Sequence, residues 1–144
     1  MQNQNLKNHS RILPVYHILL YSVVILCFIG GLWRLYISYR QHSGRVTAAV
    51  IVGLCYAVLL LTWYARSFAL VAQDRAIRAE ENLRHLALTG KLPDPKLTTR
   101  QMIALRFADD TEFVLLAERA AKEKMKPADI KKSIVNWRAD NYRV

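Results

Sequence analysis

Acidic residues are missing from the first half of the chain, where the first carboxylate is Asp74. An unpaired carboxylate is costly within a lipid bilayer, so this absence is expected of a segment that lies in a membrane. Two membrane spans without an acidic residue offer no path for an ion, which argues against a transporter built from one copy. The absence therefore favours a membrane anchor over a channel or pump.

Sequence motifs of the common enzyme families are also missing. The chain contains no G-x-x-x-x-G-K-[ST], no G-x-G-x-x-G and no G-x-S-x-G. The adjacent carboxylates of Asp109 and Asp110 stand at the start of a predicted helix, where capping explains them. No two histidines have a metal-ligand spacing; they are His9, His17, His42 and His85. We therefore predict no enzyme, no catalytic residue, no metal and no cofactor.

Cysteine is scarce, with only Cys27 and Cys55, each near the middle of an apolar run. A redox pair needs an exposed and activated thiolate, which a hydrocarbon environment disfavours. We therefore interpret both cysteines as small packing residues, although a contact between them stays open because they fall at a similar depth.

Two long apolar runs dominate what the first half does contain. Pro14 to Tyr36 and Val46 to Trp63 are each long enough, at ~1.5 Å per residue, to cross most or all of a ~30 Å hydrocarbon layer. The polar segment between them, Arg40 to Arg45, includes Gly44, which can adopt a turn conformation. Buried helices of a soluble protein and a cleaved signal peptide fit less well, since the first run is too long for a signal and lacks a cleavage site. The pattern predicts an antiparallel transmembrane hairpin.

Basic residues near the ends of the runs predict the orientation of the hairpin. Those outside the loop are Lys7, Arg11, Arg66, Arg75, Arg78 and Arg84, whereas the loop contains Arg40 and Arg45. Because cytoplasmic flanks are enriched in lysine and arginine, we expect both termini in the cytoplasm.

Helical sequence continues beyond the second run, with no proline or glycine between Ser67 and Thr89. A seam of small and apolar residues follows a heptad spacing: Ala65, Ala69, Ala72, Ala76, Ala79, Leu83 and Leu86. Gly90 then ends the helix. The seam is either a docking or dimerisation surface, or a face that packs on the chain's own C-terminal module. We predict Ala72, Ala76, Ala79 and Leu83 as protein contacts, with Trp137 and Tyr142 as aromatic anchors.

Three short helices are predicted after the linker that follows Gly90. Their starts are marked by Thr98 with Gln101, by Asp109 with Glu112, and by Pro127. The third helix is expected to present Ile130, Ile134 and Trp137 on one face. These helices form a module so small that its stability as an isolated domain is expected to be marginal.

The net charge of +10 is unevenly distributed, because six of the 21 basic residues and none of the 11 acidic ones precede Ala69. This leaves the later part with a charge of about +4, so much of the basicity belongs to the membrane topology. The predicted lipid-facing basic residues are Arg66, Lys122, Lys124, Lys131 and Lys132. The same lysines could instead form a solvated face or contact nucleic acid, and nucleic acid is the least favoured partner.

A family resemblance rests on "RAIRAEENLRHLALTGKLP", "LTTRQMIALRFADDTEF" and "IKKSIVNWRADNYRV". Together these segments resemble a small bacterial two-span membrane protein family that is catalogued only as a domain of unknown function. The resemblance implies a bacterial inner-membrane setting and the same order of hairpin and helices. It implies no activity and no functional residues.

The sequence therefore predicts an all-α membrane protein: a two-helix transmembrane hairpin, a cytoplasmic stalk and a small three-helix C-terminal module. The expected divisions are an N-terminal segment 1–13, the hairpin 14–68, the stalk 69–90 and the module 91–144. The expected function is that of a non-enzymatic anchor, scaffold or accessory subunit in the bacterial inner membrane. It would contact a protein partner or a second copy, and no small-molecule substrate is inferred. The alternatives are a tethered module that binds anionic lipid or nucleic acid, and an accessory subunit of a redox or enzyme complex.

Overall fold

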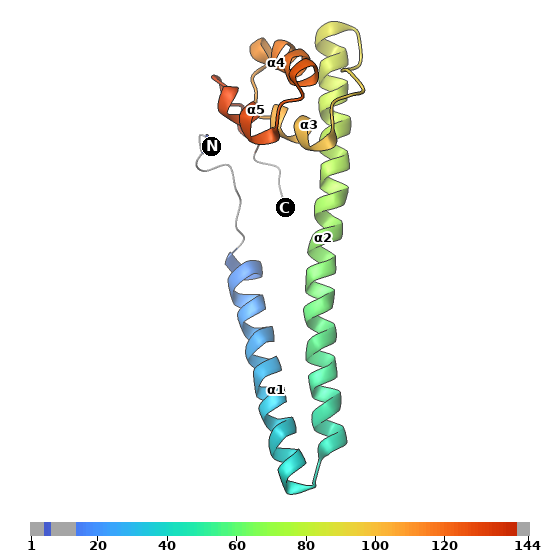
Figure 1. Cartoon of the computed structure of the whole chain (residues 1–144), viewed down its shortest axis with the longest axis vertical. Coiled ribbons are helices and arrows are strands. Elements are labelled where there is room, and N and C mark those ends of the chain that lie inside the picture. The colour runs from blue at the N-terminus through green and yellow to red at the C-terminus, as the bar shows by residue number, and fades with distance from the viewer. Residues whose placement is uncertain (1–4, 7–13, 141–144) are drawn as a thin grey trace. The chain divides into compact units, whose positions relative to one another are not determined.

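The computed structural model describes residues 5–6 and 14–140, and its regular elements there are all helical (Figure 1). The elements, in order, are η1 (Val15–Leu20, a π-helical stretch), α1 (Tyr21–Gln41), α2 (Arg45–Thr89), α3 (Thr99–Leu105), α4 (Asp110–Glu123) and α5 (Pro127–Ser133). The predicted all-α class, with two long apolar helices and a small C-terminal helical module, is confirmed. Ile12–Phe68 forms one compact unit and the chain from Ala69 onward belongs to another, so α2 runs through both.

The first unit is a hairpin in which α1 and the first part of α2 run antiparallel (Figure 1). The connection is tighter than the expected Arg40–Arg45 segment, because α1 extends to Gln41 and α2 begins at Arg45. Gly44 adopts a positive φ of 68°, as predicted, and His42 also adopts a left-handed conformation. A methyl group added at Gly31 would lie 3.3 Å from Cγ2 of Val52, so glycine allows the close approach of the two helices.

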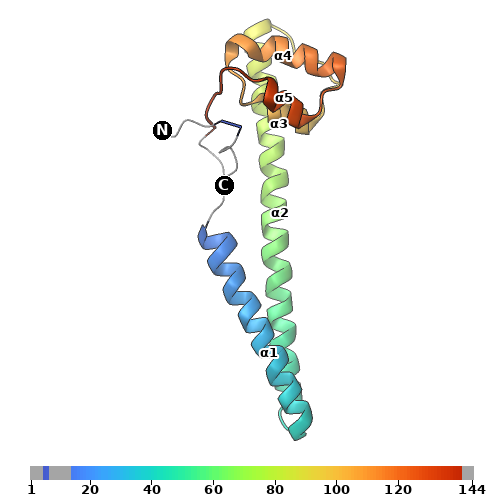
Figure 2. The same ribbon diagram turned by 60° about the vertical axis from the view of Figure 1, so that its left-hand side comes forward.

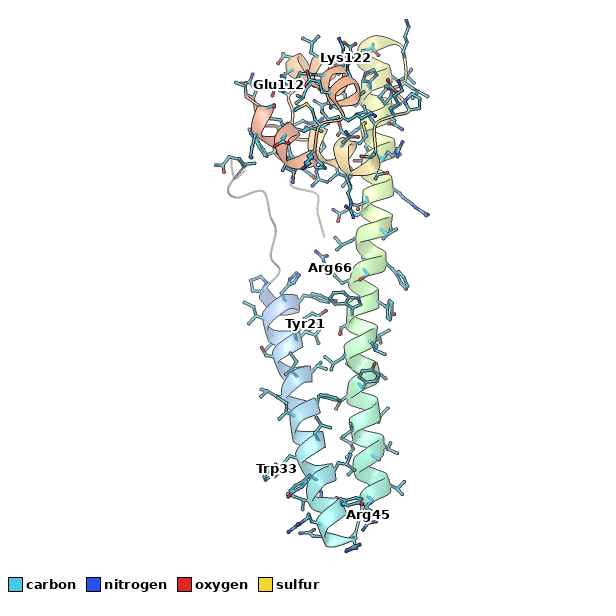
Figure 3. The ribbon with its side chains drawn as sticks, in the orientation of Figure 1. Tyr21, Trp33, Arg45, Arg66, Glu112 and Lys122 are labelled. Carbon is cyan, nitrogen blue, oxygen red and sulfur yellow. The ribbon has the colours of Figure 1, made fainter. Side chains whose placement is uncertain are left out.

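Large apolar side chains project outward from both helices of the hairpin (Figure 3). In the most apolar 18-residue stretch of each helix, only a small share is buried inside the protein: 11% for the first helix and 6% for the second. A core helix of a soluble protein would be mostly covered, so this exposure does not fit such a helix. Both helices are long and apolar enough to cross a membrane. Five aromatic residues toward the ends of the two apolar stretches are also exposed: Trp33, Tyr36, Tyr39, Trp63 and Tyr64.

The module that follows α2 has a compact core built by α3, α4 and α5. Its largest fully buried side chains are Leu97, Met102, Leu105, Phe107, Phe113 and Ile130. The predicted capping box opens α3: Thr98 Oγ1 accepts from the amide of Gln101, and Oε1 of Gln101 accepts from the amide of Thr98 at 2.8 Å. The Gln101 side chain also donates to the carbonyl of Met125 at 2.9 Å, which ties the start of α3 to the end of α4.

The C-terminal half of α2 supplies a further wall of this core, packed beside α3 and α4 (Figure 2). Ile77, Glu81 and His85 are buried at helical spacing on this side of α2. The guanidinium of Arg84 lies 4.3 Å from the centre of the Phe113 ring and donates to the carbonyl of Ala108 at 2.8 Å. The predicted stalk is therefore packed against the module along this side.

The prediction for the third short helix is partly wrong. Helix α5 ends at Ser133, and Ile134 has an extended backbone, so Trp137 does not share a helical face with Ile130. The reason is Glu112, which was expected to complete a capping box with Asp109. Its carboxylate oxygens instead accept from the amides of Val135 and Asn136 at 3.1 and 3.0 Å, which holds the chain in an extended conformation.

The extended segment then pairs with the turn between α3 and α4 through an antiparallel bridge of Ala108 and Trp137. The amide of Arg138 donates to the carbonyl of Phe107 at 2.7 Å, and the amide of Asp109 donates to the carbonyl of Asn136 at 3.0 Å. These bonds place Trp137 against the core from an extended segment rather than from a helix.

Replacing Phe113 by alanine tests the packing of the module. The Phe113→Ala change should lower the free energy of unfolding by about 3–5 kcal/mol, because it opens a cavity between α4 and α2. Hydrogen exchange of the α4 amides, in the full chain in detergent micelles, measures this loss of protection. The matched control is Leu115→Ala on the same helix, where the side chain is 71% exposed and a change of at most about 0.5 kcal/mol is expected. Equal effects of the two substitutions would contradict this core.

Candidate functional site

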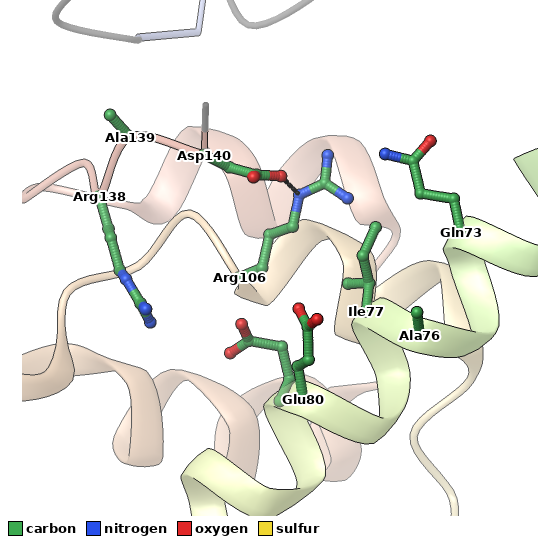
Figure 4. Close-up of a pocket in the computed structure, with 9 residues that line it drawn as sticks. Gln73, Ala76, Ile77, Glu80, Arg106, Arg138, Ala139 and Asp140 are labelled. Atoms are coloured by element: carbon green, nitrogen blue, oxygen red, sulfur yellow. Dashed lines mark ion pairs between the residues drawn. The ribbon is translucent and has the colours of Figure 1, made fainter. Parts of the chain in front are cut away.

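A cleft of about 340 Å³ opens between α2 and the extended C-terminal segment (Figure 4). The wall from α2 consists of Gln73, Ala76, Ile77, Glu80 and Glu81. The opposite wall consists of Arg106, at the end of α3, and Arg138, Ala139 and Asp140. Every one of these residues belongs to the same compact unit, so the cleft lies within that unit, where α2 meets the module.

Arg106 is the most deeply buried charged group of the cleft, with an exposed fraction of only 4%. Its guanidinium stacks 4.5 Å from the centre of the Phe107 ring, and its Nε lies 3.1 Å from Oδ2 of Asp140 as an ion pair. Within the described residues, Nη2 of Arg106 has no hydrogen-bond partner. A buried donor without a partner is costly, so this end of the guanidinium retains unused binding capacity.

Glu81 places a buried carboxylate on the wall formed by α2. Glu81 is 7% exposed, and its Oε2 atom lies 3.0 Å from Nη1 of Arg84. Burial raises the pKa of Glu81, while the hydrogen bond and charge of Arg84 and the charge of Arg138 oppose this rise. A perturbed carboxyl group beside a cleft is a feature that binding sites share with structural ion-pair networks.

Charges of both signs line the cleft. Figure 4 shows the guanidinium of Arg106 beside Asp140, and that of Arg138 directed toward the glutamate side chains of α2. Asp140 is paired with Arg106, and Glu81 is paired with Arg84. Glu80 and the guanidinium of Arg138 form no ion pair within 4.0 Å among the residues that the structure describes. The arrangement can therefore hold a polar group by charge-assisted hydrogen bonds.

The predicted seam is exposed along α2, and one of its residues, Ala76, also lines the cleft. Ala72, Ala76 and Ala79 are exposed, and Leu83 is 66% exposed. At about 100° per residue, Leu83 is roughly 160° around the helix from the buried Glu81. Of the two interpretations that the sequence left open, packing of the seam on the module is not observed for Ala72, Ala79 and Leu83, whereas Ala76 borders the cleft. Protein contact through the seam stays a prediction.

The two predicted aromatic anchors have different outcomes. Trp137 is half-buried, and its ring centre lies 5.2 Å from that of Phe107, so the ring contributes to the core of the module. Tyr142 lies outside the described residues.

The predicted lipid-facing basic residues are spread over both units. Lys122, Lys124 and Lys132 are exposed in the module, near the ends of α4 and α5. Lys131 is half-buried with its Nζ 5.6 Å from the centre of the Phe107 ring, and burial lowers its pKa. Arg66 is half-buried and belongs to the hairpin unit. Contact with lipid stays a prediction for all five.

The sequence interpretation missed Arg106, Arg138 and Glu81 as cleft residues. One signal was available for Arg106, since it interrupts the apolar run "MIALRFA" and a charge buried there needs a partner. No comparable signal marks Arg138 or Glu81. In the part of the chain that the structure describes, no group of three or more His, Cys, Asp or Glu residues is arranged to hold a metal ion.

Two carboxyl groups of the module should respond to pH with opposite signs. The pKa of Glu81 is raised from its ordinary value of 4.5, so its stabilising effect is complete below that value and is lost as the pH rises through the folded pKa. The pKa of Asp109 is lowered from 3.8 because its Oδ1 accepts from the amide and hydroxyl of Thr111. Its stabilising effect is complete above 3.8 and is lost as the pH falls through the folded pKa.

The Glu81→Gln and Asp109→Asn variants measure these contributions separately. As the pH is lowered from 7 to 4, the free energy of unfolding of the wild type should rise relative to that of the Glu81→Gln variant. As the pH is lowered from 5 to 2.5, the free energy of unfolding of the wild type should fall relative to that of the Asp109→Asn variant. Hydrogen exchange of the α4 amides at each pH, corrected for the intrinsic exchange rate, measures both differences. A parallel response of the two variants would show that the assigned causes are wrong.

Comparison with known proteins places the chain in a family. The whole chain, residues 1–144, matches the model of a family of unknown function, DUF6526. No curated protein and no solved structure gives a significant match. The resemblance noted from the sequence is thereby confirmed over its full length: the chain belongs to the DUF6526 family.

Proposed function

We propose that this protein is a non-enzymatic membrane anchor that presents a helical contact surface at the cytoplasmic face of a bacterial inner membrane. The proposal rests on the difference between the two parts of α2. Its first part belongs to a hairpin with exposed apolar side chains, and its last part has one side covered by the module and the opposite side uncovered. The uncovered seam is the proposed contact surface.

The anchor part of the proposal is supported by composition and exposure together. The hairpin exposes leucine, isoleucine, valine and aromatic side chains on both helices, and water is a poor solvent for such a surface. Its helices satisfy their own backbone hydrogen bonds, which is a requirement for a span in lipid. The excess of basic residues outside the loop supports the orientation with both termini in the cytoplasm.

The contact part of the proposal favours a second copy of the chain. Two membrane-anchored copies have parallel α2 helices, so their seams would meet as in a parallel coiled coil. In that arrangement Arg75, just before Ala76, lies opposite Glu80, just after Ala79, of the other copy. The opposite charges attract each other on both sides of the seam. The alanine residues allow the helices to approach closely, and Leu83 adds apolar area.

Disulfide trapping in native membranes tests the seam. In a background in which Cys27 and Cys55 are replaced by serine, the Ala79→Cys variant should form a crosslinked dimer on mild oxidation. The Leu88→Cys variant is the control: Leu88 is 44% exposed but lies outside the seam, and little dimer is expected. An equal yield from the two positions, or no product from Ala79→Cys, would count against the proposal.

Charge reversal identifies the partner of the seam. Arg75→Glu and Glu80→Arg should each lower the yield of the Ala79→Cys dimer, because like charges then face each other across the seam. The double reversal should restore the yield, since the attraction is rebuilt with opposite polarity. A trapped product heavier than a dimer would identify a different protein as the partner and would overturn the choice of a second copy.

A further inference from the structure

We propose that the cleft between α2 and the extended C-terminal segment binds a zwitterionic group that carries a phosphate and a primary ammonium, as a phosphoethanolamine group does. The proposal does not rest on contact through the seam, although Ala76 of the seam and Glu80 beside it also line the cleft. It rests on the charges of the cleft walls and on their existing partners.

The anionic end of the ligand is required by Arg106 and Arg138. Nη2 of Arg106 is buried and has no hydrogen-bond partner among the described residues, and it belongs to a side chain that lines the cleft. Arg138 brings a second guanidinium to the lining, which Figure 4 shows directed toward α2 and away from that of Arg106. A guanidinium matches the oxygens of a phosphate with paired donors, so each of the two arginines offers a place for the phosphate.

The cationic end is required by the other wall. The lining includes two guanidinium groups and three carboxylates, those of Glu80, Glu81 and Asp140. A simple anion would therefore enter a cleft whose formal charge is already negative, and the α2 wall would repel it. Glu81 and Asp140 have arginine partners, which leaves Glu80 to accept hydrogen bonds from a ligand ammonium. A zwitterion satisfies both walls without adding net charge.

The nature of the ammonium determines the selectivity. A primary ammonium donates three hydrogen bonds, whereas a quaternary ammonium such as that of choline donates none. A carboxylate wall without aromatic residues therefore favours ethanolamine over choline, because quaternary ammonium groups are usually held by aromatic rings. The volume of about 340 Å³ is at the small end of ligand sites, as a headgroup requires.

Two sources can supply this chemistry. A phospholipid headgroup is one, because the first cleft residue, Gln73, follows the last aromatic residue of the apolar helix, Phe68, after only five positions. A free soluble phosphoethanolamine compound is the other. Both present the same phosphate and ammonium to the cleft, so the binding experiment includes one probe for each source.

Calorimetric titration of the full chain, in lipid-free maltoside micelles, tests the recognition. Glycerophosphoethanolamine should bind saturably, whereas glycerophosphocholine, glycerol phosphate and ethanolamine should bind at least about tenfold more weakly, because each lacks one required interaction. Arg138→Gln and Glu80→Gln should each weaken the binding of glycerophosphoethanolamine by about tenfold or more. The control Arg100→Gln removes an exposed arginine of α3 outside the cleft and should leave the binding unchanged.

The source is separated by native mass spectrometry of the full chain with phosphatidylethanolamine or phosphatidylcholine added to the micelles. Preferential retention of phosphatidylethanolamine, lost in Arg138→Gln, assigns the lipid headgroup. Binding of the soluble compound alone assigns a free zwitterion and also supports the proposal. Hydrogen exchange of α4 confirms that each variant is folded. The proposal is overturned if glycerophosphoethanolamine does not bind saturably, if the choline compound binds equally well, or if neither cleft variant weakens binding.

Discussion

The continuity of α2 from Arg45 to Thr89 is the constraint on which the other parts of the structure depend. Within a helix every interior backbone group is paired inside the element, so the same backbone is stable beside lipid and beside water. Only the side chains change, from an apolar run to one rich in charged residues. One helix therefore contributes residues to both compact units.

Buried polar and charged groups gather where the end of α2 packs on the module. The covered side of α2 presents Glu81 and His85 next to Ile77, and their partners lie on α2 or just after it: Arg84 for Glu81 and the carbonyl of Lys91 for His85. Arg84 forms an ion pair with Glu81 and also lies over the ring of Phe113, and Asp140 forms an ion pair with Arg106. The module thus combines a small apolar core with a charged boundary toward α2, and the candidate cleft lies at this boundary.

The role of Glu112 illustrates how tertiary contacts replace a local one. In the sequence, Asp109 and Glu112 have the spacing of a capping box, and Asp109 does cap α4. The Glu112 carboxylate instead accepts from two amides more than twenty residues away, because they come within reach once α5 folds back. This competition ends α5 early and makes an extended strand-like segment from residues that have a helical pattern.

Patterns that depend on near neighbours were determined by the sequence alone: the all-helical class, the apolar hairpin, the turn at Gly44, the length of α2 and the starts of the short helices. Helical period, caps and glycine conformation are local properties, so they can be read without knowing the rest of the fold. Tertiary structure alone decided which side of α2 the module covers, since small residues on one side and mixed residues on the other both permit packing. It also decided the place of Trp137 and brought Arg106, Arg138 and Glu81 to one cleft, because contacts between distant segments depend on how the helices meet and not on spacing along the chain.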